Sequence, residues 1–244
     1  MFIRKDFEAD KRRNAQAQSQ DATLRAVAHE FIVRSDQYDY GYQWTWLGLP
    51  VIQLPQDIML TQEIIWECKP DLIIETGIAW GGSVILYASM LQLIGKGEVV
   101  AVDLNLMDHV TAEIMAYPFS ERIHLYKGSS TDPDIVARIK SHVKPGRSVM
   151  VLLDSNHTGD HVSAELVRYA PLVTKGQFLV VSDTIIEDLP AHPQRQRLWG
   201  PGNNPKTALQ GYLKTTDRFV VEDYPNAKPL LTFTPGGYCR CVKG

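Results

Sequence analysis

The segment from Leu72 to Leu91, LIIETGIAWGGSVILYASML, constrains the fold more than any other part of the sequence. An apolar run reaches the acid Glu75, and a second long apolar run begins after several small residues. Those small residues include Gly77, Gly81 and Ser83. A strand that passes through a glycine turn into a helix commonly binds a nucleotide-like cofactor in α/β proteins. The sequence therefore predicts a cofactor site at this turn.

Apolar segments alternate with helical segments from residue 71 onward. The strand-like segments read DLIIET, EVVAVD, RIHLYKG, SVMVLLD and QFLVVSD. Near-continuous Val, Ile and Leu runs indicate strands that are buried on both faces, as in a parallel sheet covered by helices. This pattern predicts a doubly wound, Rossmann-like α/β fold.

The last two strand-like segments, RFVVEDY and LLTFTPGGYCRCV, are separated by only a short loop. Strands joined without a crossover helix pair antiparallel. A mostly parallel sheet that ends in an antiparallel strand fits the S-adenosylmethionine (SAM) methyltransferase variant of the fold better than a plain dehydrogenase.

The N-terminal region, residues 1–56, is predicted to form a helical arm and a long ordered aromatic loop, before a Rossmann-like domain at 57–244. Residues 1–20 are polar and charged, so we expect a flexible or solvent-exposed helical arm. A helix is expected over 21–35 with Asp21 as its N-cap, and another over 57–68.

Composition excludes several classes of protein. A chain of 244 residues with 44% hydrophobic content can bury one substantial core. A net charge of −3 argues against a general nucleic-acid binder, and no apolar run is long enough to span a membrane. Cys68, Cys239 and Cys241 are expected to be free thiols, which is typical of a reducing cytoplasm.

The glycine spacing indicates which cofactor binds. It is G-x-x-x-G-G rather than the G-x-G-x-x-G of dinucleotide sites. The acid Glu75 disfavours a pyrophosphate and suits a cation, such as the amino group or sulfonium of SAM. Asp103 closes the second strand, where a carboxylate binds ribose hydroxyls, and Ser129 in the KGSS segment is expected to border the adenine. The alternatives are that the glycine segment is an ordinary tight turn without a ligand and that Asp103 is a solvated carboxylate in a loop.

Two further acids end strands. Asp154 follows the fourth strand and Asp183 follows the fifth, so the two should meet at one edge of the sheet. Paired carboxylates there can hold Mg²⁺ or Mn²⁺, which would activate a substrate hydroxyl for methyl transfer. The alternative is that either acid only caps the following helix.

His157 and His161 are spaced i, i+4 around the start of the next helix. We interpret His157 as a candidate base or substrate contact and His161 as a hydrogen-bonding residue at the helix start. Asp160 is expected in the first helical turn, where it complements the helix dipole.

A long Pro/Gly-rich connection follows Asp183, with Asn204 as the expected N-cap of a helix. Such a loop beside a site often determines the substrate, although a solvated surface loop is equally compatible. The side chains expected to contact an anionic or sugar-like substrate are Arg195, Arg197, Trp199 and Lys206.

Several motifs together resemble the cephalosporin hydroxylase family. They are WLGLPVIQLPQD, PDLIIETGIAWGGS, LDSNHTGDHV, VVSDTIIEDLP and GPGNNPKTA, and the resemblance covers roughly residues 38–244. That family has a SAM-dependent methyltransferase fold and is related to macrolide sugar O-methyltransferases. The resemblance implies SAM in the turn from Glu75 to Ser83 with Asp103, and Mg²⁺ at the ends of the fourth and fifth strands.

One position departs from the family pattern. Antibiotic-pathway members carry two adjacent acids after the fifth strand, whereas this chain has Ser182 before Asp183. Ser182 is expected to give a hydroxyl ligand or to leave its place to water.

The main hypothesis is a SAM-dependent, metal-assisted O-methyltransferase that acts on a hydroxyl of a sugar or small secondary metabolite. The alternatives are a non-catalytic SAM-binding partner protein and a nicotinamide-dependent oxidoreductase. A homo-oligomer is expected because similar enzymes often assemble, and the aromatic segment at 38–46 would serve an interface or cover the site.

Overall fold

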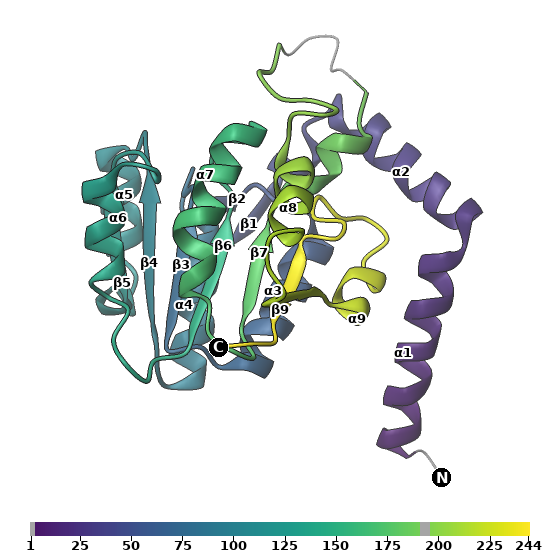
Figure 1. Ribbon diagram of the computed structural model, residues 1–244, viewed down its shortest axis with the longest axis horizontal. Coiled ribbons are helices and arrows are strands. Elements are labelled where there is room, and N and C mark those ends of the chain that lie inside the picture. The colour runs from purple at the N-terminus through teal and green to yellow at the C-terminus, as the bar shows by residue number, and fades with distance from the viewer. Residues whose placement is uncertain (1–2, 191–195) are drawn as a thin grey trace.

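A mostly parallel sheet forms the centre of the protein, as the computed structural model of the chain shows for residues 3–190 and 196–244 (Figure 1). Its strand order is β5-β4-β3-β6-β7-β9-β8. The strands are β3 (Leu72–Thr76), β4 (Glu98–Asp103), β5 (Ile123–Lys127), β6 (Val149–Leu153), β7 (Phe178–Val181), β8 (Phe219–Val221) and β9 (Tyr238–Cys241). Only β9 among them runs antiparallel to its neighbours, β7 and β8. The predicted fold is therefore confirmed.

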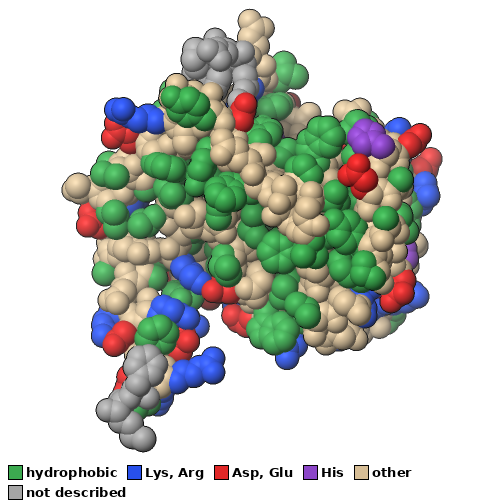
Figure 2. Space-filling model, turned by 180° about the vertical axis from the view of Figure 1, so that it is seen from behind, with side chains coloured by type: hydrophobic (Ala, Val, Ile, Leu, Met, Phe, Trp, Pro, Cys, Tyr) green, Lys and Arg blue, Asp and Glu red, His purple; other side chains and the backbone are tan. Residues whose placement is uncertain are grey.

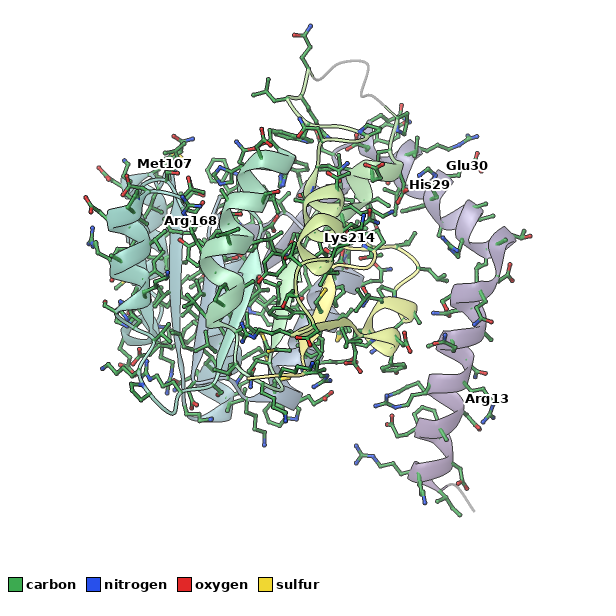
Figure 3. All side chains as sticks on the ribbon, viewed as in Figure 1. Arg13, His29, Glu30, Met107, Arg168 and Lys214 are labelled. Atoms are coloured by element: carbon green, nitrogen blue, oxygen red, sulfur yellow. The ribbon has the colours of Figure 1, made fainter. Side chains whose placement is uncertain are left out.

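Helices cover both faces of this sheet because the strand side chains alternate between two buried layers. Ile73 of β3 belongs to the layer beneath α3 (Pro55–Cys68), α4 (Gly82–Ile94) and α5 (Asp108–Met115). Leu72 and Ile74 belong to the layer beneath α6 (Pro133–Lys140), α7 (Gly159–Tyr169) and α8 (Pro205–Leu213). Figure 3 shows how side chains fill the space between sheet and helices. Burial on both faces explains the unbroken apolar strands.

The N-terminal arm consists of α1 (Arg4–Gln20) and α2 (Ala22–Asp36). Asp21 caps α2 as predicted, because its side chain accepts a hydrogen bond from Leu24 N at 2.9 Å. Figure 1 shows α1 standing off the sheet, and Figure 2 shows the N-terminal end of the chain projecting from the body of the protein. It reaches the body at α9 (Asp223–Ala227), where Gln18 Nε2 donates to the carbonyl of Lys228 at 2.7 Å. Residues 4–20 are thus helical and mostly exposed, and the division of the chain into an arm at 1–56 and a domain at 57–244 stays a prediction.

Three local expectations need correction. The aromatic segment expected as a loop contains a 3-10 turn, η1 (Tyr40–Tyr42), and a hairpin of β1 (Trp44–Trp46) and β2 (Leu49–Val51). Its two turn residues, Leu47 and Gly48, both have positive φ, which suits a tight hairpin but is unusual for Leu. Helix α3 begins at Pro55 rather than at 57, and the short helix α9 lies between the last two strands.

The remaining short elements are 3-10 turns, η2 (Ser120–Arg122), η3 (Ala170–Leu172) and η4 (Thr184–Asp188). Cys68, Cys239 and Cys241 are free, as predicted, and the latter two are buried on β9. Within the described ranges, no helix has the length and apolarity that crossing a membrane requires.

Helix α8 begins at a capping box formed by Asn204 and Thr207. The Asn204 side chain accepts from Lys206 N at 2.9 Å and from Thr207 N at 3.2 Å, and its amide donates to the Gly200 carbonyl. Asn204 is fully buried, so water cannot take over these hydrogen bonds if the side chain is removed. The loop that precedes α8 therefore depends on this residue for its attachment to the helix.

We predict that Asn204→Ala lowers the free energy of unfolding by about 1–2 kcal/mol, because the helix start loses its cap and buried donors are left unpaired. Thr158→Ala is the matched control, since Thr158 occupies the N-cap of α7 without making a side-chain cap bond. Urea denaturation measures both variants. Equal losses in the two would contradict the assigned role of Asn204.

Candidate functional site

A cavity of about 1010 Å³ opens at the carboxyl ends of the parallel strands. Gly77 follows β3, Asp103 ends β4, Asp154 follows β6, and Asp183 follows β7, and all four line this cavity. The strand order reverses between β3 and β6, and this switch point is where open α/β sheets bind ligands. The structure thus gathers strand-end residues that lie far apart in the sequence.

The glycine turn is required by close backbone packing. Gly77 has φ +90°, and a Cβ atom on it would lie 2.0 Å from the carbonyl oxygen of Asp154. Gly81 has φ +87° and forms the N-cap of α4. Neither position tolerates a side chain without distortion. The turn can therefore bring bare backbone to the cavity wall.

Asp103 organises this turn in addition to lining the cavity. Its Oδ2 accepts from Ile78 N at 2.8 Å and Ala79 N at 3.0 Å, while Oδ1 accepts from Asn105 N at 2.7 Å. A carboxylate has about four acceptor positions, so one remains for a ligand. The sequence did not indicate this structural role, because it depends on two backbone amides of a neighbouring loop.

Glu75 lies within β3 and is only 1% exposed, behind the cavity-lining Ser83. Burial raises the pKa of Glu75 to about 8; the charge of Asp103 adds to the shift, and hydrogen bonds from Ser83 and Tyr87 oppose it. Its Oε2 has no hydrogen-bond partner within the described part of the chain. A cation placed beyond Ser83 would favour the ionised form of this buried carboxyl group.

A three-residue cluster forms a candidate metal site. Ligand atoms of Asp154, His157 and Asp183 all lie within 4.8 Å of one another. His157 Nε2 is 3.2 Å from Asp183 Oδ2. Burial, and then the charges of Asp183 and Glu75, raise the pKa of Asp154 well above its ordinary value. A bound cation would relieve this repulsion, and oxygen ligands of this kind suit Mg²⁺ or Mn²⁺.

Three other residues that the sequence singled out, Ser129, Ser182 and His161, differ in their relation to the cavity. Ser129 lines the cavity, whereas Ser182 is absent from the described residues that line it, and its backbone N donates to the Leu153 carbonyl at 3.0 Å. The role of Ser182 as a metal ligand stays a prediction. His161 Nε2 lies 3.0 Å from the Ser130 hydroxyl and 3.1 Å from Ser155 Oγ, which confirms its hydrogen-bonding role.

Two of the four residues predicted to contact a substrate from the connection after β7 line the cavity. Arg197 and Trp199 line the cavity, and the Trp199 ring meets His157 edge to face at 5.0 Å between centroids. Lys206 instead pairs with Asp188 at 2.6 Å, so its expected substrate contact is not supported. Arg195 lies outside the described residues.

Residues of the N-terminal region also line the cavity. The sequence did not predict this position for the charged residues among them. Asp36 at the end of α2, Asp39 and Tyr42 all line the cavity, as does Gln53 after β2. The aromatic residues of 38–46 were predicted to cover the site or to form an interface, and the position of Tyr42 fits a cover. No pattern in the sequence indicated that Asp36 and Asp39 would line the cavity.

A second cluster of possible ligands lies at the opposite ends of the strands. Glu98 begins β4, and His124 and His142 lie beside it with ligand atoms within 4.8 Å. Arg147 donates to both oxygens of the Glu98 carboxylate, at 3.1 and 3.2 Å. Because that charge is already neutralised, we interpret this cluster as a structural ion pair.

Comparisons with known proteins identify the family of this chain. Residues 38–242 match the family described as rhamnosyl O-methyltransferase/CmcI. Rhamnosyl O-methyltransferase of Mycobacterium leprae (strain TN) is 30% identical over 221 residues, covering 87% of this chain and 90% of that protein.

The chain belongs to the rhamnosyl O-methyltransferase/CmcI family.

Solved structures share the fold of this family member at low sequence identity. The structure of CmcI with Mg and SAM has a TM-score of 0.57 at 18% identity, covering 83% of this chain and 78% of that one. An O-methyltransferase from Bacillus cereus in complex with SAH has a TM-score of 0.52 at 14% identity, covering 92% of both chains. The family and fold predicted from the sequence are thus confirmed.

We predict that Glu75→Gln changes how the stability of this rhamnosyl O-methyltransferase/CmcI family member depends on pH. The ordinary pKa of Glu, 4.5, applies to the unfolded chain, and about 8 applies to the folded one. Folding therefore binds a proton at Glu75 between these values, and the wild type loses stability as pH rises through that window. Gln mimics the protonated acid, so Glu75→Gln should be more stable than wild type by about 4 kcal/mol at pH 8 and by less than about 1 kcal/mol at pH 5.

Denaturant unfolding of the ligand-free protein at the two pH values measures this difference. Glu67→Gln, an exposed carboxylate on α3, is the control and should show no such pH dependence. Parallel stability curves for wild type and Glu75→Gln would show that the pKa of Glu75 is not raised.

Proposed function

We propose that the protein transfers a methyl group from SAM to a sugar hydroxyl, with Mg²⁺ or Mn²⁺ held by Asp154 and Asp183. One observation carries this proposal: Asp154, Asp183 and His157 converge on the same cavity as the glycine turn. The names of the relatives give further support, because the M. leprae protein is a rhamnosyl O-methyltransferase and CmcI has a structure with Mg and SAM.

The residues fit a cationic nucleoside ligand. Asp103 keeps one acceptor position for a ribose hydroxyl, and Ser129 lines the cavity nearby. Gly77 and Gly81 let the turn approach the ligand closely. Ser83 would lie between the ligand and the carboxyl group of Glu75. This wall combines negative charge with small residues, which suits SAM rather than a pyrophosphate.

When bound, SAM supplies an electrophilic methyl group, and the divalent ion lowers the pKa of the acceptor hydroxyl. The chain itself orients the acceptor and removes its proton. His157 is the proposed base, because its ring lies between the carboxylate of Asp183 and the indole of Trp199. Asp183 stabilises the imidazolium that forms when His157 Nδ1 or Nε2 takes the proton.

The outer half of the cavity fits a sugar. Tyr42, Trp199 and Phe233 give it an aromatic wall, and Arg197 gives it a donor. Trp199 Nε1 is buried without an acceptor in the described part of the chain, so it is ready to donate to a ligand oxygen. Aromatic surfaces with a few placed polar groups are typical of small-molecule sites.

Two alternatives predict different results. A nicotinamide-dependent oxidoreductase conflicts with the glycine spacing and with the family assignment. A non-catalytic SAM-binding partner would keep the cofactor wall, and its function would be insensitive to the metal cluster. Variants of that cluster therefore separate the second alternative from the proposal.

We predict that Asp154→Asn reduces methyl transfer at least 100-fold, while the Kd for SAM changes less than threefold. The substitution removes a metal ligand and keeps the shape of the side chain. Mass spectrometry of rhamnosides and other small glycosides after incubation with SAM measures transfer, and calorimetry with Mg²⁺ or EDTA measures binding. Glu98→Gln, in the structural cluster, is the control. Unchanged turnover in Asp154→Asn would eliminate the metal-assisted mechanism.

We also predict that SAM binding at pH 7 releases a proton. The pKa of Glu75 is about 8, so the carboxyl group is mostly protonated before a cation binds beyond Ser83. A cation favours the ionised form, and the affinity for SAM should rise with pH up to about 8. Calorimetry in buffers with different ionisation enthalpies detects the proton, which Glu75→Gln should abolish. Identical heats in all buffers for the wild type would contradict this linkage.

A further inference from the structure

We propose that Asp57 is a positioning residue that fixes the metal ligand Asp183 through residues 232–237, here the support segment. Asp57 lies on α3, and neither its position in the sequence nor the family comparison assigns it a role. The inference rests on the proposed function, because it takes Asp183 as a ligand. It adds a residue that contacts neither substrate nor metal but determines where a ligand lies.

Asp57 is a buried acid, 3% exposed, whose two oxygens bind the support segment and β9. Oδ1 accepts hydrogen bonds from the hydroxyls of Thr232 and Tyr238, and Oδ2 accepts from Phe233 N at 2.8 Å. These contacts join residues that are more than 170 positions apart. Burial raises the pKa of Asp57 to about 6, and its hydrogen bonds limit that rise, so it is mainly ionised at neutral pH.

The support segment in turn holds the chain on both sides of Asp183. Val181 N donates to the Gly237 carbonyl at 3.0 Å, and Ile185 N donates to the Phe233 carbonyl at 3.1 Å. Thr184 Oγ1 donates to the Pro235 carbonyl at 2.9 Å. The approach is close, since a Cβ atom on Gly237 would lie 2.2 Å from the Val181 carbonyl oxygen. The residues flanking Asp183 therefore cannot shift unless the support segment shifts.

Asp183 needs such support because its backbone is unfavourable. Its φ is +56°, in the left-handed region that residues other than Gly rarely adopt. A strained conformation of this kind persists only where surrounding contacts determine it. The same residue contributes an oxygen to the cluster with Asp154 and His157. Asp57 supplies the anchor, because Phe233 N donates to it while the Phe233 carbonyl accepts from Ile185.

The test substitutes Asp57→Ala and measures Mn²⁺ binding by the EPR signal of the free ion. Ala has no acceptor for Phe233 N or for the hydroxyls of Thr232 and Tyr238, so the support segment loses its central bond. We expect the Kd for Mn²⁺ to rise at least tenfold, while the Kd for SAM changes less than twofold. In the methyl-transfer assay with SAM and a glycoside, kcat should fall while the KM for SAM stays unchanged. Glu63→Gln, on the same helix but paired with Lys228, should alter none of these values.

A second variant guards against misfolding of the first. Thr184→Val keeps Asp57 and removes only the bond to Pro235, so it should weaken Mn²⁺ binding in the same direction, at least threefold. Unchanged Mn²⁺ affinity in both folded variants would overturn the proposal.

Hydrogen exchange of the metal-free protein gives a readout independent of the proposed function. Exchange in 183–187 should accelerate at least tenfold in Asp57→Ala and stay unchanged in Glu63→Gln. If the wild type binds no Mn²⁺ but this acceleration occurs, the metal assignment fails and the positioning role of Asp57 stands. If exchange is unchanged, the positioning role itself is wrong.

Discussion

Burial of acids at the carboxyl edge of the sheet is the constraint on which this structure depends. Glu75 and Asp154 are held in a low-dielectric environment, and Asp183 lies beside Asp154. Carboxylates that repel one another away from water are costly unless protons or cations neutralise them. A fold that retains such a cluster gives up stability in its ligand-free form. In the proposed function, a cationic cofactor and a metal would offset that cost, which would join the energetics of the fold to its chemistry.

The rest of the architecture serves to keep these acids in place. Parallel strands buried on both faces fix where each strand ends, and the tight contact of Gly77 with Asp154 joins two neighbouring strand ends directly. Asp103 orders the glycine turn through backbone amides, and Asp57 orders the support segment in the same manner. Two acids thus shape backbone segments that line the cavity, while Asp154 and Asp183 contribute side chains to its wall.

Much of this was predictable from the sequence. The strand segments are unbroken apolar runs, and an acid or glycine after each run predicts a residue at the carboxyl edge, so Gly77, Asp103, Asp154 and Asp183 were all expected there. What could not be predicted depends on contacts distant in the sequence. Tyr42 lines the cavity from the 3-10 turn between α2 and β1, and Asp57 acts on residues more than 170 positions away. The hairpin at β1 and β2 was missed because Leu47 is an unusual residue for its turn.

The carboxylates of Asp154 and Asp183 are proposed to hold a divalent cation. Anomalous diffraction from crystals grown with Mn²⁺ and SAM tests this proposal most directly, because Mn²⁺ scatters anomalously and protein atoms hardly do. We predict a strong anomalous peak at about 2.2 Å from an oxygen of each carboxylate, as expected for a hard divalent ion. No peak between them, or a peak only beside Glu98, His124 and His142, would contradict it.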